Sequence, residues 1–249
     1  MMMKSKIRDK IKSVVYKEQF QPSIIGMFVN PFYITRKELF KHISSFSHLV
    51  KGRVLDIGCG QKPYYNLFSS DEYIGLEVDT PENRKNKKAD VFYDGKRIPF
   101  PDSYFDWVIS TEVFEHVFNP EEFLSEAYRV LKPGGGLLMT CPFVWDEHEQ
   151  PYDFARYSSF GIKFLLEKHG FRVVEQRKTA GDIRIIFQLI NAYIYKVLVS
   201  RSSSSINKLL CLLFTSIFNI LGESLYRFLP KNEDLYLDNI IYARKELKK

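Results

Sequence analysis

The stretch VLDIGCG at residues 54–60 decides the fold class, because a short, mostly apolar run leads directly into a turn that contains two glycines. Such a run is typical of a buried strand in an open α/β sheet. Gly58 and Gly60 can adopt positive φ angles and permit close approach of a ligand to the main chain, so they predict a cofactor-binding turn. On this interpretation a side chain at either glycine would fill the ligand's space, and Asp56 offers the ligand a carboxylate.

A second apolar run, YIGLEVD at residues 73–79, narrows the class of cofactor. It ends in carboxylates about 20 residues after the glycine turn, which is the spacing that brings an acid to a ribose diol. Glu77 and Asp79 fall on the same side of the expected strand. A dinucleotide such as NAD is disfavoured, because residues 61–63 read Gln-Lys-Pro and lack the third small residue that a pyrophosphate site requires.

Two further motifs follow, DGKRIPFPDSYFDWVISTEVFEHV and LKPGGGLLMTCPF. Together with the first two, in this order and spacing, they resemble the class I S-adenosylmethionine-dependent methyltransferases over roughly residues 51–178. The resemblance implies S-adenosyl-L-methionine as cofactor and methyl transfer as the activity. It assigns the cofactor site to Asp56, Gly58, Cys59, Gly60, Glu77, Val78, Asp94, Gly95, Thr111 and Glu112.

Within that set the resemblance implies individual roles. The glycine turn and Asp56 would line the methionine end of the cofactor, and Cys59 would contribute its backbone amide. Glu77 would hold both ribose hydroxyls and Asp94 would meet the adenine amino group. Thr111 and Glu112 would lie along the methionine moiety.

Simpler roles compete with several of these assignments. Asp56 could cap its own turn and Glu77 could be a solvated strand end, although the two acids flank one glycine turn at the required separation. Asp94 has two rivals, Asp79 and Asp90, and Asp94-Gly95 is also an ordinary turn dipeptide.

The sequence predicts a doubly wound, Rossmann-like α/β fold with a seven-stranded sheet that is parallel except for an antiparallel last strand. The expected strands are residues 53–57, 73–78, 90–93, 107–110, 136–141, 171–175 and 237–243. Asn119 is a candidate N-cap for a helix that begins at Pro120, and residues 160–169 form another expected helix.

Two segments extend this core. We expect residues 1–50 to form a basic N-terminal helical cap and residues 51–249 to form the methyltransferase domain. Within that domain, residues 183–229 form an apolar helical insertion before the last strand. Its longest uncharged apolar run, residues 209–222, is shorter than the roughly 20 residues of a membrane-spanning helix. A packed hairpin, a homodimer contact and a peripheral membrane contact all remain open for it.

Composition is consistent with one α/β domain plus an elaboration, with 249 residues of which 45% are hydrophobic. Residues 1–53 carry eleven Lys and Arg against three Asp and Glu, so this segment accounts for the net charge of +6. No motif indicates nucleic acid, so an anionic lipid or an acidic glycan is the favoured partner of these charges. The N-terminus does not read as a secretory signal, and the expected location is cytoplasmic, with a peripheral position on the inner membrane face left open.

The acceptor site is expected on residues 141–157, which follow the fifth strand beside the cofactor. His148 is the candidate general base, and Asp153 would orient it or act itself. His116 is a second histidine near the site, for which a core or capping role is at least as plausible. The candidate substrate-binding residues, chosen as aromatic and planar polar groups that suit a sugar, are Trp145, Tyr152, Arg156 and Tyr157.

No metal is expected. Neighbouring residues of the extended run 146–149, Asp-Glu-His-Glu, point in opposite directions and are poorly placed to share an ion. The three cysteines are far apart and show no metal-binding or disulfide spacing. The favoured acceptor is a sugar or a lipid-linked glycan intermediate. A quinone-like or other lipophilic molecule is the alternative, and a catalytically idle cofactor-binding scaffold is the alternative of another class.

Overall fold

The computed structural model describes residues 13–200 and 204–246, which form two compact units. The larger unit comprises His42–Lys178 and Asp238–Lys249, and the smaller comprises Met1–Lys41 and Thr179–Leu237, in each case within the described residues. This division differs from the predicted boundary at residue 50, because the segment between the last two strands groups with the N-terminal segment and not with the sheet.

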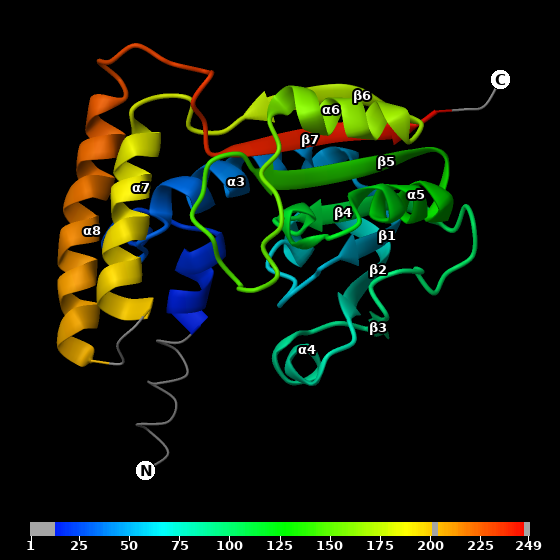
Figure 1. Ribbon diagram of the computed structural model, residues 1–249, viewed down its shortest axis with the longest axis horizontal. Helices are drawn as coiled ribbons and strands as arrows, with labels where there is room; N and C mark the ends of the chain where they lie inside the picture. The colour runs from blue at the N-terminus through cyan, green and yellow to red at the C-terminus, as the bar shows by residue number, and fades with distance from the viewer. Residues whose placement is uncertain (1–12, 201–203, 247–249) are drawn as a thin grey trace. The chain divides into compact units, whose positions relative to one another are not determined.

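The larger unit contains the predicted seven-stranded sheet, which Figure 1 shows with β7 in red between β5 and β6. Its strands lie in the order β3-β2-β1-β4-β5-β7-β6. Strands β1 to β5 pair in parallel, and β7 pairs antiparallel with both β5 and β6. The strands are β1 (Lys51–Ile57), β2 (Ser69–Val78), β3 (Val91–Tyr93), β4 (Phe105–Thr111), β5 (Leu131–Pro142), β6 (Phe171–Lys178) and β7 (Asp238–Lys245). The predicted fold class is therefore confirmed.

The centre of the sheet is buried on both faces, which explains its near-continuous apolar sequence. Leu55, Val108 and Leu137 occupy adjacent register positions across β1, β4 and β5 and are fully buried. Trp107 stacks on Tyr242 of β7, with ring centroids 5.4 Å apart. Gly136 lies under the indole, where a Cβ would come within 2.5 Å of the ring, so this strand position requires glycine.

Helices connect these strands and flank the sheet. They are α4 (Pro81–Asn86), α5 (Pro120–Val130) and α6 (Ser159–Lys168), together with the short turns η1 (Ser47–Leu49), η2 (Tyr65–Leu67) and η3 (Phe114–His116). Ser158 caps α6 by accepting a hydrogen bond from the Gly161 amide. Asn119 occupies the N-cap position of α5, with Pro120 first in the helix as predicted, but its side chain makes no cap bond and instead donates to Glu122 Oε2 at 3.2 Å.

The smaller unit is helical. Residues 13–20 are helical and are followed by α2 (Gly26–Val29), α3 (Tyr33–Phe46), in which the unit boundary falls, α7 (Arg184–Tyr195), the π-helical η4 (Lys196–Ser200) and α8 (Ser205–Leu225). Helices α7 and α8 lie side by side (Figure 1). The predicted basic helix before residue 13 and part of the serine-rich joint, 201–203, lie outside the described residues.

Polar side chains fill the interior of this unit. Arg184 is 7% exposed and forms ion pairs with Asp182 at 2.7 Å and Glu38 at 2.8 Å. Asn191 of α7 donates to Asn219 of α8 at 2.8 Å, and both are fully buried. Within the described residues, α8 is the one helix long and apolar enough to cross a membrane by length and composition, and 22% of its most apolar window is buried.

Candidate active site

The glycine turn follows β1 as predicted and is fastened to the end of β2. Gly58 and Gly60 have φ angles of +71° and +53°. The amides of Gly58 and Cys59 both donate to the Leu76 carbonyl, at 2.9 and 3.3 Å, and the Gly60 amide donates to Glu77 Oε1 at 2.7 Å. The turn therefore lies against the end of the neighbouring strand.

The two glycines are required for different reasons, which corrects one part of the sequence interpretation. A Cβ at Gly58 would lie 2.4 Å from Val113 Cγ2, so the protein's own packing fills that space. A Cβ at Gly60 would meet nothing within 4 Å. Only Gly60 therefore borders open space that a ligand could use, while Cys59 is buried between them.

Asp56 and Glu77 are both buried beside this turn, at 4% and 7% exposure. Asp56 accepts a hydrogen bond from the Tyr73 hydroxyl at 2.7 Å. Burial nevertheless raises the pKa of Asp56 to about 7, and the nearby Glu77 acts in the same direction. Burial also raises the pKa of Glu77, opposed by the bond from Gly60. Two desolvated carboxyls at one site favour a ligand that carries hydroxyls or positive charge.

The surroundings of Asp94 differ from those of Asp79 and Asp90, the two alternative residues for the adenine contact. Asp79 is held by both guanidinium nitrogens of Arg84, at 2.6 and 2.7 Å, and Asp90 accepts from the Gly75 amide and pairs with Lys62. Asp94 directly follows β3, next to the strand that carries Glu77 and Val78. Its Oδ1 accepts from the amides of Lys96 and Arg97, which lowers the pKa of this carboxyl.

Asp94 therefore caps its own turn, which is the simpler role that the sequence also allowed beside the adenine contact. Gly95, with φ +80°, completes the turn, and a Cβ there would have ordinary contacts with Val78.

Thr111 ends β4, and Glu112 follows it with a positive φ of +54°, which is unusual for a residue with a Cβ. Thr140 of β5 holds this conformation. The Glu112 amide donates to the Thr140 carbonyl and hydroxyl, and that hydroxyl donates to Glu112 Oε1 at 2.8 Å. Strained backbone of this kind is enriched at functional sites. The predicted cofactor residues thus come from the adjacent carboxyl ends of β1, β2, β3 and β4.

The loop after β5 brings three predicted residues together. Asp153 Oδ1 and Oδ2 accept from Arg156 at 2.5 and 2.7 Å, and Oδ2 also accepts from the His148 amide at 2.9 Å. Although partial burial acts in the opposite direction, these bonds lower the pKa of Asp153 to about 2. Asp153 Oδ2 lies 3.3 Å from His148 Nδ1. Asp153 is therefore placed to orient His148, one of its two predicted roles.

Glu115 is the residue that the sequence interpretation missed. It lies on η3, is fully buried, and its Oε1 is 3.8 Å from Nε2 of both His148 and His116. The two imidazoles lie close together, with ring centroids 4.7 Å apart. Burial raises the pKa of Glu115 to about 8 and lowers that of His148, so the folded chain favours an imidazole with a free lone pair. Glu115, His116 and His148 are the described residues that could hold a metal ion.

The predicted substrate-binding residues have different surroundings. Tyr152 is 65% exposed and Trp145 is partly exposed. The Tyr157 ring packs on Phe114 in the core, with centroids 5.0 Å apart, so its ring is used in packing. Arg156 donates to the carbonyls of Ala155 and Asp146 as well as to Asp153, and it braces the loop.

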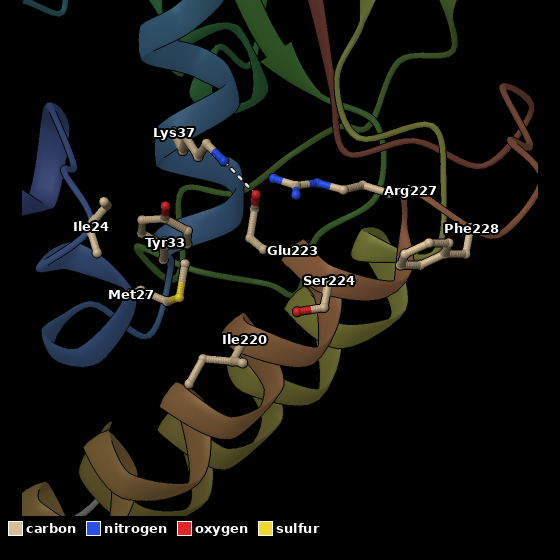
Figure 2. Close-up of a pocket in the computed structure, with 9 residues that line it drawn as sticks. All are labelled: Ile24, Met27, Tyr33, Lys37, Ile220, Glu223, Ser224, Arg227 and Phe228. Atoms are coloured by element: carbon tan, nitrogen blue, oxygen red, sulfur yellow. Dashed lines mark hydrogen bonds and ion pairs between the residues drawn. The ribbon is translucent and has the colours of Figure 1, made fainter.

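A separate cavity of about 530 Å³ lies in the smaller unit, lined by residues of α8, α3 and the N-terminal segment (Figure 2). Lys37 and Glu223 form an ion pair at its wall. None of the predicted cofactor or acceptor residues lines this cavity.

Comparison with known proteins identifies the larger unit. Residues 55–139 match the family model of a methyltransferase domain. This unit is a methyltransferase domain of the class I S-adenosylmethionine-dependent type. S-Adenosyl-L-methionine is thus its cofactor. The matched segment contains the glycine turn, Glu77, Asp94, Glu112 and Glu115.

Individual relatives are distant. A probable S-adenosylmethionine-dependent methyltransferase of Mycolicibacterium smegmatis is 27% identical over 61% of this chain and 63% of its own. The ubiquinone/menaquinone biosynthesis C-methyltransferase UbiE of a Ruegeria species is 31% identical over 43% of each chain. Among solved structures, the [4+2]-cyclase SpnF has a TM-score of 0.55 at 18% identity and covers 84% of this chain and 81% of its own. The alignments thus span less than two thirds of these two curated relatives, and the structural likeness establishes the fold alone.

The site's residues fit this methyltransferase cofactor. Open space borders Gly60, two buried carboxyls flank the turn, and Asp94 and Glu112 lie at the ends of neighbouring strands. These groups would hold the ribose, adenine and methionine parts in the way that the resemblance implies.

We expect Asp56→Ala or Glu77→Ala to weaken S-adenosylhomocysteine binding about 10- to 150-fold, because each removes a charge-assisted hydrogen bond worth about 1.5–3 kcal/mol. Titration calorimetry measures this loss. Asp79→Ala is the matched control, since Asp79 is exposed and already held by Arg84. Unchanged affinity in both variants, or tighter binding of NAD than of S-adenosylhomocysteine, would refute the site.

Proposed function

We propose that the protein transfers a methyl group from S-adenosylmethionine to a hydroxyl of a sugar or of a lipid-linked glycan intermediate, in the cytoplasm at the inner membrane face. The observation that carries the proposal is the His148-Asp153-Arg156 arrangement on the loop after β5, within the same unit as the glycine turn. In parallel α/β sheets this edge is where ligands bind.

A hydroxyl acceptor must be oriented, shielded from water and relieved of its proton. His148 suits this task because Asp153 lies beside Nδ1, so a proton on that nitrogen leaves the Nε2 lone pair available. Arg156 occupies both oxygens of Asp153, so the carboxylate orients the ring and does not compete for the acceptor's proton. When bound, the cofactor supplies a methyl group on a positively charged sulfur that leaves as a neutral thioether.

Exposed aromatic rings near this loop support a sugar acceptor. Phe154 packs edge-to-face on Phe118, with centroids 5.2 Å apart, and they remain 43% and 75% exposed. Together with Tyr152 they offer flat apolar faces next to polar groups. The C–H faces of a pyranose ring match such a surface.

A quinone-like or other lipophilic acceptor is the second candidate. The similarity to the Ruegeria UbiE protein favours it, because that relative is named for C-methylation in ubiquinone and menaquinone biosynthesis. The exposed aromatic rings are equally compatible with a flat aromatic substrate, whereas the polar His148-Asp153-Arg156 arrangement favours the sugar.

We expect His148→Ala to slow turnover about 10²- to 10⁴-fold, the usual range for loss of an acid–base residue, with nearly unchanged cofactor affinity. Release of S-adenosylhomocysteine is measured with sugar nucleotides, polyprenyl-phosphate-linked sugars and demethylated quinols as probes. Phe160→Ala, an exposed residue of α6, is the control. Full activity of His148→Ala would remove His148 from the mechanism. Cofactor binding without turnover on any class of probe would instead favour a catalytically idle scaffold.

A further inference from the structure

Three potential ligand atoms converge at the carboxyl edge of the sheet. Glu115 and His116 belong to η3, which follows β4, and His148 belongs to the loop that follows β5. Each histidine Nε2 is 3.8 Å from Glu115 Oε1, and one ligand atom from each of the three residues lies within 4.8 Å of the others. Ligands bound to one ion at about 2.0–2.2 Å in tetrahedral geometry lie about 3.3–3.6 Å apart. The two 3.8 Å separations therefore need shifts of a few tenths of an ångström, and the widest separation, up to 4.8 Å, must close by about 1.2–1.5 Å.

The Glu115 carboxyl group independently indicates a missing cationic partner. Its side chain is 1% exposed, and neither oxygen has a hydrogen-bond partner on another residue among 13–200 and 204–246. A buried carboxylate without donors is costly. Arg156, the nearby cation, is held by Asp153 and does not hydrogen-bond Glu115.

The outer contacts of the two histidines are those of metal ligands. His116 Nδ1 lies 2.7 Å from the Tyr152 carbonyl, and His148 Nδ1 lies 3.3 Å from both the Asp146 carbonyl and Asp153 Oδ2. The Arg156 guanidinium is also 3.5 Å from His148 Nδ1. Acceptors at Nδ1 favour the tautomer with a proton on that nitrogen and direct the Nε2 lone pair inward. Metal-bound histidines usually have such second contacts.

We propose that Glu115, His116 and His148 bind one divalent transition-metal ion. Two imidazoles and one carboxylate suit Zn²⁺, Co²⁺ or Mn²⁺, and three protein ligands leave a coordination position for an acceptor oxygen. This site differs from the sequence expectation of no metal and uses only one residue of the run 146–149. Its catalytic meaning rests on the proposed methyl transfer: with the ion bound, His148 Nε2 would be a ligand in place of a base. The ion's charge would then lower the pKa of the acceptor hydroxyl, which would lose its proton to water.

The test measures metal binding without cofactor or acceptor, so its outcome is independent of methyl transfer. Chelator-treated, dialysed full-length protein is titrated with Zn²⁺ in a calorimeter, and with Co²⁺ by visible absorption. We expect one ion per chain. Glu115→Gln and His116→Ala should each weaken binding by more than the roughly 10- to 100-fold typical of losing an outer contact.

The matched control is His169→Ala, which removes a histidine that lies 3.8 Å from a single carboxylate, Glu121, and it should leave affinity unchanged. Glu115→Gln keeps the shape of the side chain and removes a buried charge, so we expect it to fold, and thermal melting checks this. No stoichiometric binding, or wild-type affinity in Glu115→Gln, overturns the site. An active enzyme that binds no metal would leave the proposed function intact and refute only the metal.

A different observation carries a second inference, about the surface of α8. This helix buries its polar side and exposes its apolar side. Between residues 209 and 221 its fully buried residues are Cys211, Thr215 and Asn219. Over the same span every exposed residue is apolar: Leu209, Leu210, Leu213, Phe214, Ile217, Ile220 and Leu221. We call this exposed set the α8 apolar face.

The buried side chains of α8 form hydrogen bonds and an ion pair with other residues of the smaller unit. Asn219 donates to the Met27 and Asn30 carbonyls and accepts from Asn191, while Glu223 pairs with Lys37 (Figure 2). Turning the helix to bury its apolar face would break these bonds. The orientation is therefore fixed by the unit's own interior, as in proteins whose outer surface faces lipid.

We infer that the α8 apolar face lies on an anionic lipid bilayer. Lys208 and Arg227 are exposed at either end of the face, where their charged ends can reach phosphate groups while their stems follow the apolar surface. α8 is long enough to span a bilayer, but Asn219 and Glu223 hold its other side within its own unit, which fits a helix that lies in the interface. The α8 apolar face, residues 209–221, then follows the lipid surface over about 20 Å.

Flotation with phosphatidylglycerol-containing vesicles tests this surface. We expect the wild-type chain to float and the double variant Leu213→Glu with Ile217→Glu to lose about tenfold or more of its bound fraction. Both residues are more than half exposed, so folding should be kept. Phe160→Glu, 81% exposed on α6, is the control and should float normally.

Three outcomes would overturn the lipid assignment. The wild-type chain could fail to float, or Phe160→Glu could lose binding equally. The wild-type chain could also form a concentration-dependent dimer that the double variant abolishes, which would make a second copy the occupant of the face.

Discussion

The hydrogen bond from the Gly60 amide to the Glu77 carboxylate fastens the first turn of the sheet to the end of the next strand. The amides of Gly58 and Cys59 add two bonds to the Leu76 carbonyl just before it. These bonds require the backbone to reverse within three residues, which the positive φ angles of the two glycines permit. The position of every other cofactor residue is then set by the pairing of β2, β3 and β4 around β1.

The parallel pairing also explains why the acceptor residues collect next to this turn. Strands β4 and β5 are paired through Thr111 and Thr140, so η3 and the loop after β5 leave the sheet at neighbouring points. Thr140 braces the unusual backbone of Glu112 at that point. A few residues later Glu115, His116 and His148 converge. The Phe154 and Ala155 amides donate to the Glu115 carbonyl, and these bonds connect the loop after β5 to η3. The fully buried acid Glu115 thus lies where two connections meet.

Local pattern was sufficient to predict all seven strands, because their apolar runs and flanking turns are strong signals. Boundaries were less accurate: β5 begins at Leu131, where the predicted strand began at Gly136, since Lys132-Pro133-Gly134 read as a helix stop. The role of Gly58 required knowledge of Val113, and the packing of Tyr157 required Phe114. Glu115 was missed because its burial depends on tertiary contacts, and a glutamate in a short turn is ordinarily solvated. The polar interior of the smaller unit was hidden for the same reason, since α8 reads as apolar on most sides.

The two ends of the connection between β6 and β7 lie side by side. The Leu237 amide donates to the Thr179 carbonyl at 3.0 Å, directly before β7 pairs with the end of β6. The intervening residues therefore form a closed loop whose ends are fixed at hydrogen-bond distance. Chain statistics give such a loop a closure cost that rises by only about 0.6 kcal/mol for each doubling of its length. Strand pairing at this edge therefore fixes the distance between the two ends of the loop. It places little constraint on the number of residues in the loop. Descendants of this sequence could lengthen, shorten or exchange that segment while the order of the strands stayed the same.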